Sequence, residues 1–246
     1  MGFIDSHVHL SQFPDMGLVT RLAVSTGTAL YSCGVDQESS LLTLEVSKAL
    51  PNLIRPFVGV HPAEASVGGD LGWYPDLLGK AAGAGEIGLD PKYSETTPAS
   101  AQRLVFEAQL EAAERFRKPV QVHSRGAERR CLEVLGGFRL PSVLLHWFEG
   151  EGLLDKVVDR GYFVSFGPAL LYSKRLQRLV LRCPQELVLT ESDGPVAFEP
   201  LSGASGPTLV PSVAFKIAQV WRKPFAEVSQ SLRKNGEAFL GLARKG

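Results

Sequence analysis

The sequence predicts an α/β protein folded as a single (β/α)₈ TIM barrel. Short apolar, β-branched runs recur along the chain, and segments with helical spacing of apolar residues separate them. This alternation is typical of parallel strands joined by helical crossovers. With 246 residues, of which 44% are hydrophobic, the chain has the length of one barrel of eight such units.

Eight apolar runs are the predicted strands. Glycine, proline or polar residues bound most of them, as expected where a chain leaves a sheet. In chain order they cover residues 3–8, 29–35, 53–60, 84–89, 120–123, 142–146, 162–166 and 186–191.

The helices are predicted from the segments between these runs. In the clearest one, Phe106, Leu110 and Ala113 share one face, and we expect Thr97 to be the N-cap before Pro98. The same spacing predicts helices within 40–50, 127–137, 153–161, 170–182 and 211–223. Residues 193–212 are rich in glycine and proline and are predicted to form a long loop. Because no repeat or linker interrupts the pattern, residues 1–246 are predicted to form one domain.

Composition limits the partners and the compartment. Lys+Arg and Asp+Glu balance at 26 each, so there is no overall basic field and any contact with nucleic acid must be local. Cys33, Cys131 and Cys183 form no CxxC pair, which favours a reducing compartment and predicts a cytoplasmic protein. We expect no membrane partner, since no apolar run approaches about 18 residues. The sequence indicates no obligate protein partner.

The ionisable residues with the most informative positions follow the predicted strands. Because the carboxyl ends of barrel strands converge, residues scattered along the chain would meet there. Each one alone also fits a structural role, as a hydrogen-bonded histidine, a core carboxylate or a turn cap. Together they would be costly to bury without compensating cations. The set is His7, His9, His61, Glu86, His123, His146 and Asp193.

Mixed imidazole and carboxylate donors point to divalent metal ions such as zinc or manganese. Side chains alternate in an extended segment, so His7 and His9 face the same side. We assign His7, His9, Glu86 and Asp193 to one ion. Glu86 is shared with a second ion, which His123 and His146 also hold. Two ions about 3.5–4 Å apart polarise an electrophile and activate water. The set therefore predicts hydrolysis.

The motifs that carry these residues resemble one family. In order they read "DSHVHL", "GVHP", "GEIGLD", "QRLVFEAQLEAA", "KPVQVHSR", "LLHWFEG", "GYFVSFGP" and "LTESDGP", with "NGEAFLGL" near the C-terminus. They resemble the TatD-like metal-dependent hydrolases of the amidohydrolase superfamily, which include TatD deoxyribonucleases. The resemblance runs from residue 3 to about residue 242. It implies a (β/α)₈ barrel with the metal ligands His7, His9, Glu86, His123, His146 and Asp193.

The resemblance also implies an activity. Members of this family are typically phosphodiesterases that act on DNA, some of them as exonucleases from the 3′ end, and Mg²⁺ commonly supports the reaction. We therefore expect a metal-dependent deoxyribonuclease acting on DNA ends or a small phosphodiester, with two divalent ions (Zn, Mn or Mg). The alternatives are a hydrolase of a small ester, amide or aminoacyl ester, and a metal-binding protein without catalysis.

Roles follow for individual residues. Asp193 is the candidate general base, and Glu86 shares the catalytic centre. Matching "GVHP" makes His61 a phosphate-contacting residue or a support for the ligands. Arg125 is placed to bind a phosphate oxygen, unless it pairs with Glu128 instead.

The chain departs from the family pattern at the substrate side. "HWFEG" has tryptophan and glutamate where many relatives have cysteine and serine, and "GPVAFEP" follows Asp193 where DNA-cleaving relatives usually carry an aromatic residue and a leucine. A base could stack on Trp147 or Tyr93, although Trp147 also fits the core.

Overall fold

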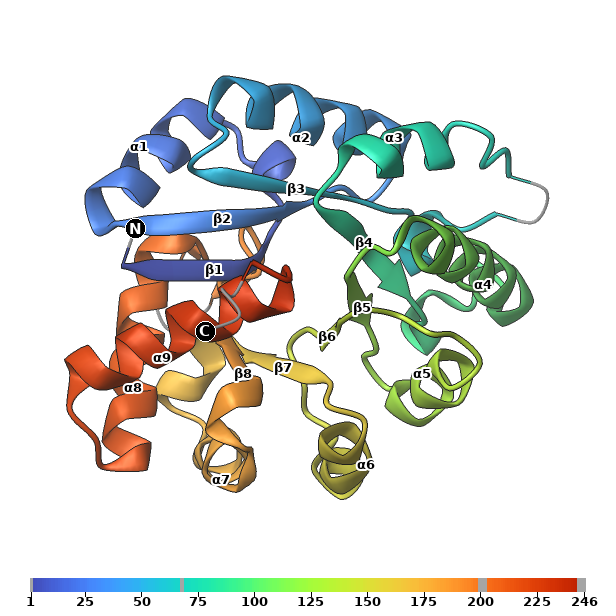
Figure 1. Ribbon diagram of the computed structural model, residues 1–246. Coiled ribbons are helices and arrows are strands. Elements are labelled where there is room, and N and C mark those ends of the chain that lie inside the picture. Colours follow the sequence, from blue (N-terminus) through green and yellow to red (C-terminus); the bar gives the residue numbers. More distant parts are fainter. Residues whose placement is uncertain (1, 67–68, 199–202, 243–246) are drawn as a thin grey trace.

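The computed structural model describes residues 2–66, 69–198 and 203–242 and confirms the predicted barrel. Eight strands pair in chain order, each parallel to the next. Figure 1 shows them surrounding a common axis. They are β1 (Phe3–Val8), β2 (Thr28–Cys33), β3 (Ile54–Val58), β4 (Gly83–Gly88), β5 (Val120–His123), β6 (Val143–Leu145), β7 (Phe163–Phe166) and β8 (Val188–Thr190).

The barrel nearly closes where the chain after β8 returns to β1. The N–H of Asp193 donates to the carbonyl of His7 at 2.9 Å, and the N–H of His9 donates to that of Gly194 at 2.8 Å. The buried carboxylate of Asp5 accepts from both the N–H and the hydroxyl of Ser192, at 2.8 and 2.6 Å. These bonds bring the ends of β1 and β8 together.

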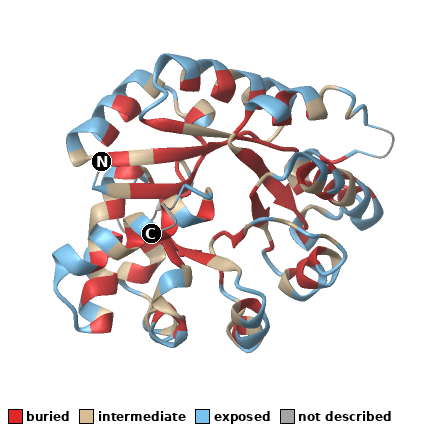
Figure 2. Ribbon diagram, in the orientation of Figure 1, coloured by how far each residue is buried: buried red, intermediate tan, exposed pale blue. Residues whose placement is uncertain are grey.

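Helices cover the outside of the barrel, with their buried faces against the strands (Figures 1 and 2). Among the described residues, no helix has the length and apolar character needed to span a membrane. The helices are α1 (Met16–Thr26), α2 (Gln37–Ala49), α3 (Tyr74–Lys80), α4 (Ala99–Phe116), α5 (Glu128–Leu135), α6 (Leu154–Asp159), α7 (Lys174–Arg182), α8 (Val210–Trp221) and α9 (Phe225–Phe239).

An aromatic cluster joins α9 to the barrel strands. Phe239 of α9 stacks on Phe57 of β3, with ring centroids 5.9 Å apart. The Tyr31 hydroxyl of β2 donates to the carbonyl of Gly236 at 2.9 Å. These fully buried contacts fix the last helix against β2 and β3.

Helix α4 holds two of the strand ends in place. The side-chain amide of Gln109 pairs with the backbone of Val60, at 2.7 and 3.1 Å, and that of Gln102 pairs with the backbone of Asp90, at 2.8 and 3.0 Å. Both glutamines are buried, and their bonds satisfy backbone groups that leave the sheet. The chain segments around His61 and Asp90 are thereby fixed.

Two local predictions were wrong. Helix α4 begins at Ala99 with Pro98 at the cap position, and Thr97 is not the N-cap because its hydroxyl donates to the carbonyl of Ala63 at 3.0 Å. The predicted loop 193–212 contains two short antiparallel strands, β9 (Ala197–Phe198) and β10 (Gly203–Ala204). Residues 199–202 of that loop lie outside the described residues.

Gly88 permits the close approach of β4 to β5, and replacing it by alanine is expected to destabilise the protein. Its φ is +149°, and an added Cβ would lie 2.0 Å from the carbonyl oxygen of His123. We expect Gly88→Ala to lower the free energy of unfolding by about 1–3 kcal/mol, measured with urea in the presence of a chelator. Gly152→Ala is the matched control, because nothing lies within 4 Å of its added Cβ. Equal unfolding midpoints for the two variants would contradict this account.

Candidate active site

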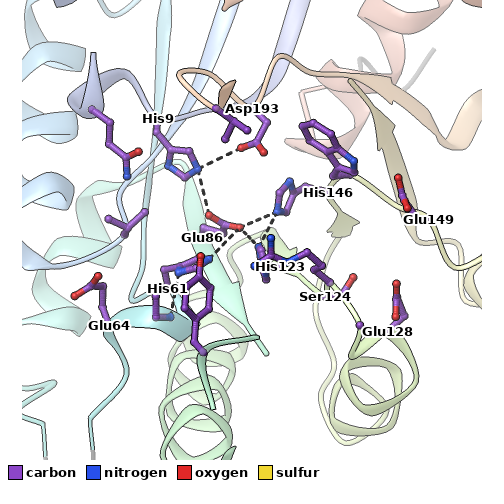
Figure 3. A pocket seen from close by; sticks show the side chains of 18 residues that line it. His9, His61, Glu64, Glu86, His123, Ser124, Glu128, His146, Glu149 and Asp193 are labelled. Atoms are coloured by element: carbon purple, nitrogen blue, oxygen red, sulfur yellow. Dashed lines mark hydrogen bonds and ion pairs between the residues drawn. The ribbon is translucent and has the colours of Figure 1, made fainter. Parts of the chain in front are cut away.

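The residues predicted from the strand ends meet at the carboxyl end of the barrel. A cavity of about 580 Å³ opens there, and Figure 3 shows His9, His61, Glu86, His123, His146 and Asp193 in its wall. His7 is fully buried among them, on β1. Arg125 also lines the cavity, with a side chain that is 51% exposed.

Glu86 lies at the centre of the cluster. Its Oε1 is 2.6 Å from His123 Nδ1 and 2.7 Å from His146 Nε2, while its Oε2 is 3.2 Å from His9 Nε2. The two oxygens therefore face imidazoles from opposite sides of the site (Figure 3). A carboxylate in this position can bridge two cations.

Hydrogen bonds at the outer nitrogens set the tautomers of the histidines on the β1 side. His7 Nδ1 lies 2.7 Å from the side-chain oxygen of Gln121, and His9 Nδ1 lies 3.2 Å from the carbonyl of Cys33. Both partners are oxygen acceptors, so each Nδ1 carries the proton. The two Nε2 lone pairs then face each other across 3.2 Å. Such an arrangement repels unless a proton or a metal cation lies between the two nitrogens.

His123 is held in the opposite sense. Its Nε2 donates to Asp90 Oδ2 at 2.8 Å, while its Nδ1 faces Glu86 Oε1 at 2.6 Å. The same Asp90 oxygen accepts from Arg125 Nε and Nη2, at 2.9 and 2.6 Å. Arg125 therefore pairs with Asp90 and not with Glu128. Through Asp90 the arginine is connected to His123, a candidate metal ligand.

His61 differs from the other histidines. The N–H of Ala63 donates to its Nδ1 at 3.1 Å, which leaves the proton of the neutral ring on Nε2. Burial lowers the pKa of His61 to about 4, so the ring is neutral near pH 7. Its Nε2 lies 3.8 Å from Glu86 Oε1. A neutral N–H donor is suited to a substrate oxygen rather than to a metal ion.

The electrostatics of the cluster favour positive charge. Burial alone would lower the pKa of His9, but its bonds to Asp193 and Glu86 and their charges raise it to about 10. For Glu86 the directions are reversed. Burial alone would raise its pKa, but the surrounding histidines hold this pKa well below the usual range. The site therefore favours positive charge, and its converging nitrogen and oxygen donors fit divalent metal ions.

The spacing of the donor atoms divides them into three overlapping groups. They are His7, His9 and Glu86; His7, His146 and Asp193; and His61, Glu86 and His123. The first group follows the assignment made from the sequence. His146 also approaches the His7 side, and His61 lies closer to the candidate ligands than the sequence indicated.

Three supporting residues were not identified from the sequence. Gln121 holds His7, the carbonyl of Cys33 holds His9, and the fully buried Glu191 lies 3.8 Å from His146 Nδ1. Gln121 and His123 lie two apart on β5 and so on the same face. A polar residue inside the apolar run "VQVH" was the available signal.

Comparisons with known proteins identify the family of the chain. A family model described as TatD related DNase matches residues 4–241. The chain is 31% identical to the 3′-5′ ssDNA/RNA exonuclease TatD of Edwardsiella piscicida, over 92% of this chain and 93% of that protein. It is 27% identical to the human Deoxyribonuclease TATDN3, over 96% of this chain and 93% of that protein.

A solved structure supports the fold. The TatD homologue YJJV from Escherichia coli superposes with a TM-score of 0.85 at 22% identity, covering 97% of each chain. The family match covers nearly the full length of the chain. It agrees with the barrel fold and with the cluster of histidines and carboxylates at the carboxyl end of the barrel. The chain therefore belongs to the family of TatD-related DNases.

Proposed function

We propose that the protein is an exonuclease that removes nucleotides from the 3′ ends of single-stranded DNA or RNA, using two divalent metal ions. Family membership makes the chain a metal-dependent hydrolase of phosphodiester bonds, and the small-ester alternative is not favoured. The observation that carries the proposal is Glu86, whose two oxygens face separate sets of imidazole nitrogens.

The proposed ligands are His7, His9, Glu86, His123, His146 and Asp193. Zn²⁺ or Mn²⁺ suits the imidazole nitrogens, and Mg²⁺ suits a weaker, carboxylate-dominated site. When bound, such ions polarise the phosphodiester and lower the pKa of a water molecule. Asp193 would accept the proton of the attacking water. Burial would raise the pKa of Asp193, but His9 and the neighbouring histidines lower it, so the carboxylate is ready to accept.

His61 and Arg125 are proposed to hold the scissile phosphate. The Nε2–H of His61 donates to one oxygen, and the guanidinium of Arg125 supplies positive charge to another. Asp90 orients the guanidinium, while the Tyr93 ring lies 5.7 Å from it. Only part of the arginine's donor set is occupied by Asp90, which leaves donors for the substrate.

Replacing Arg125 by alanine is expected to raise KM for single-stranded DNA about tenfold, with a smaller effect on kcat. The physical reason is the loss of a charge-assisted bond to phosphate. The neighbouring exposed Arg129 provides the control Arg129→Ala, which should leave KM unchanged. Equal KM values for all three proteins would remove Arg125 from the substrate site.

The function is tested by hydrolysis of 5′-labelled single-stranded DNA. Metal-stripped protein is resupplied with Mg²⁺, Mn²⁺ or Zn²⁺, and simple esters serve as comparison substrates. A ladder that shortens from the 3′ end only when metal is present supports the proposal. Intact DNA together with metal-dependent ester cleavage would refute it.

A cytoplasmic location is part of the proposal. It is supported by Cys33, Cys131 and Cys183, which are all free thiols and buried. Such thiols fit a reducing compartment.

A further inference from the structure

Trp147 has a backbone conformation that turns it toward the cavity. It follows His146 directly in the turn after β6, and both residues line the cavity. The φ of Trp147 is +43°, in the left-handed region that a bulky residue rarely adopts. This kink allows two neighbouring side chains to face one site.

A buried carboxylate holds the kink. The N–H of Trp147 donates to Glu191 Oε1 at 2.9 Å, and the hydroxyl of Ser165 donates to Glu191 Oε2 at 2.5 Å. Glu191 is fully buried. A backbone strained in this way persists only where its surroundings impose it, and such strain is concentrated at functional sites.

The indole is a partly exposed apolar surface next to the proposed reaction centre. A Cβ added at Gly167 would lie 3.7 Å from its Cε3, so one edge packs near the end of β7. The residue as a whole is only half-buried. Val196 also lines the cavity and is 44% exposed. Together they contribute apolar surface to the cavity.

The remaining wall is unfavourable to a long polyanion. Apart from the proposed metal ligands Glu86 and Asp193, the described residues that line the cavity include one arginine, Arg125, and three carboxylates, those of Glu64, Glu128 and Glu149, the last of which is paired with Arg175. Figure 3 shows Glu64, Glu128 and Glu149 away from the central cluster. Phosphates beyond the scissile one would approach these charges. Binding energy must therefore come from another part of the substrate, and a nucleobase is the apolar part available.

We propose that Trp147 determines specificity by stacking on the base of the terminal nucleotide. This inference rests on the proposed function. A base that is paired and stacked in a duplex must first be released, so the stacking contact selects single-stranded ends. The substrate class is a single-stranded polynucleotide whose 3′-terminal nucleotide carries a base. Purines are preferred, because they stack over a larger area than pyrimidines.

The first test compares two oligonucleotides that differ only in the 3′-terminal residue, adenosine or an abasic residue. We expect Trp147→Ala to lower kcat/KM about tenfold or more for the adenosine end and to leave the abasic end unchanged. Trp147→Phe should retain most of the activity, since a phenyl ring still stacks. Equal losses on both substrates would indicate a purely structural role and overturn the proposal, as would no loss on either.

The second test does not depend on hydrolysis. Adenosine 5′-monophosphate should quench tryptophan fluorescence, whereas ribose 5-phosphate should not. The quenching should vanish in Trp147→Phe and persist in Trp73→Phe, because Trp73 packs edge-on against Tyr74 outside the cavity. If wild-type protein cleaves neither oligonucleotide, the proposed function fails, and quenching that depends on Trp147 would still support a base-binding site. Quenching that survives in Trp147→Phe would overturn the inference.

Discussion

Replacing Glu86 by glutamine is expected to reduce kcat on single-stranded DNA about 10³-fold or more and to lower the number of metal ions bound. Glu86 is 2% exposed and lies within 3.2 Å of the imidazoles of His9, His123 and His146, at the ends of β1, β5 and β6. Glutamine preserves the shape but offers only one neutral oxygen acceptor, so the charge that attracts both ions is lost. Metal binding is measured by calorimetry on metal-stripped protein.

The control is Glu111→Gln, on the exposed side of α4, which should bind metal and cleave DNA like the wild type. Unfolding of the metal-free proteins checks that Glu86→Gln still folds. A Glu86→Gln protein that binds two ions with unchanged affinity would contradict the bridging role.

Replacing Asp193 by asparagine is expected to reduce kcat about 10²- to 10⁴-fold at saturating metal. Asp193 Oδ1 lies 3.5 Å from His9 Nε2 and 3.6 Å from His7 Nε2, beside one proposed ion. Asparagine keeps an oxygen there but cannot accept a proton from water. We therefore expect metal affinity to fall less than the rate, with KM little changed.

Asp159→Asn, at the exposed end of α6, is the matched control and should have the wild-type rate. Full recovery of Asp193→Asn at high metal concentration would show that Asp193 is a ligand without a role as base.

The barrel was predictable because the chain repeats one simple pattern. Apolar strand runs alternate with helical segments, and the ends of parallel strands must converge, so His123 and Asp193 were expected to meet although 70 positions separate them in the sequence. The period of two in "DSHVH" likewise placed His7 and His9 on one side. In this part of the site, local geometry and topology agree.

The supporting contacts were not predictable, since they depend on register and on loop conformation. Glu191 meets Trp147 only because β6, β7 and β8 bring them together, and no local motif encodes the left-handed φ at Trp147. Arg125 could reach either Glu128 or Asp90, and the closeness of the β4 and β5 ends favours Asp90. The start of α4 was misplaced because Thr97 bonds to a distant loop.

Titrating Mn²⁺ into metal-stripped protein while following single-stranded DNA cleavage tests the central claim most directly. The account predicts that the rate rises with added metal, reaches its maximum when two ions are bound per chain, and stays near zero in Glu86→Gln at every point. Full activity with one ion per chain, or cleavage by the metal-stripped protein itself, would contradict it.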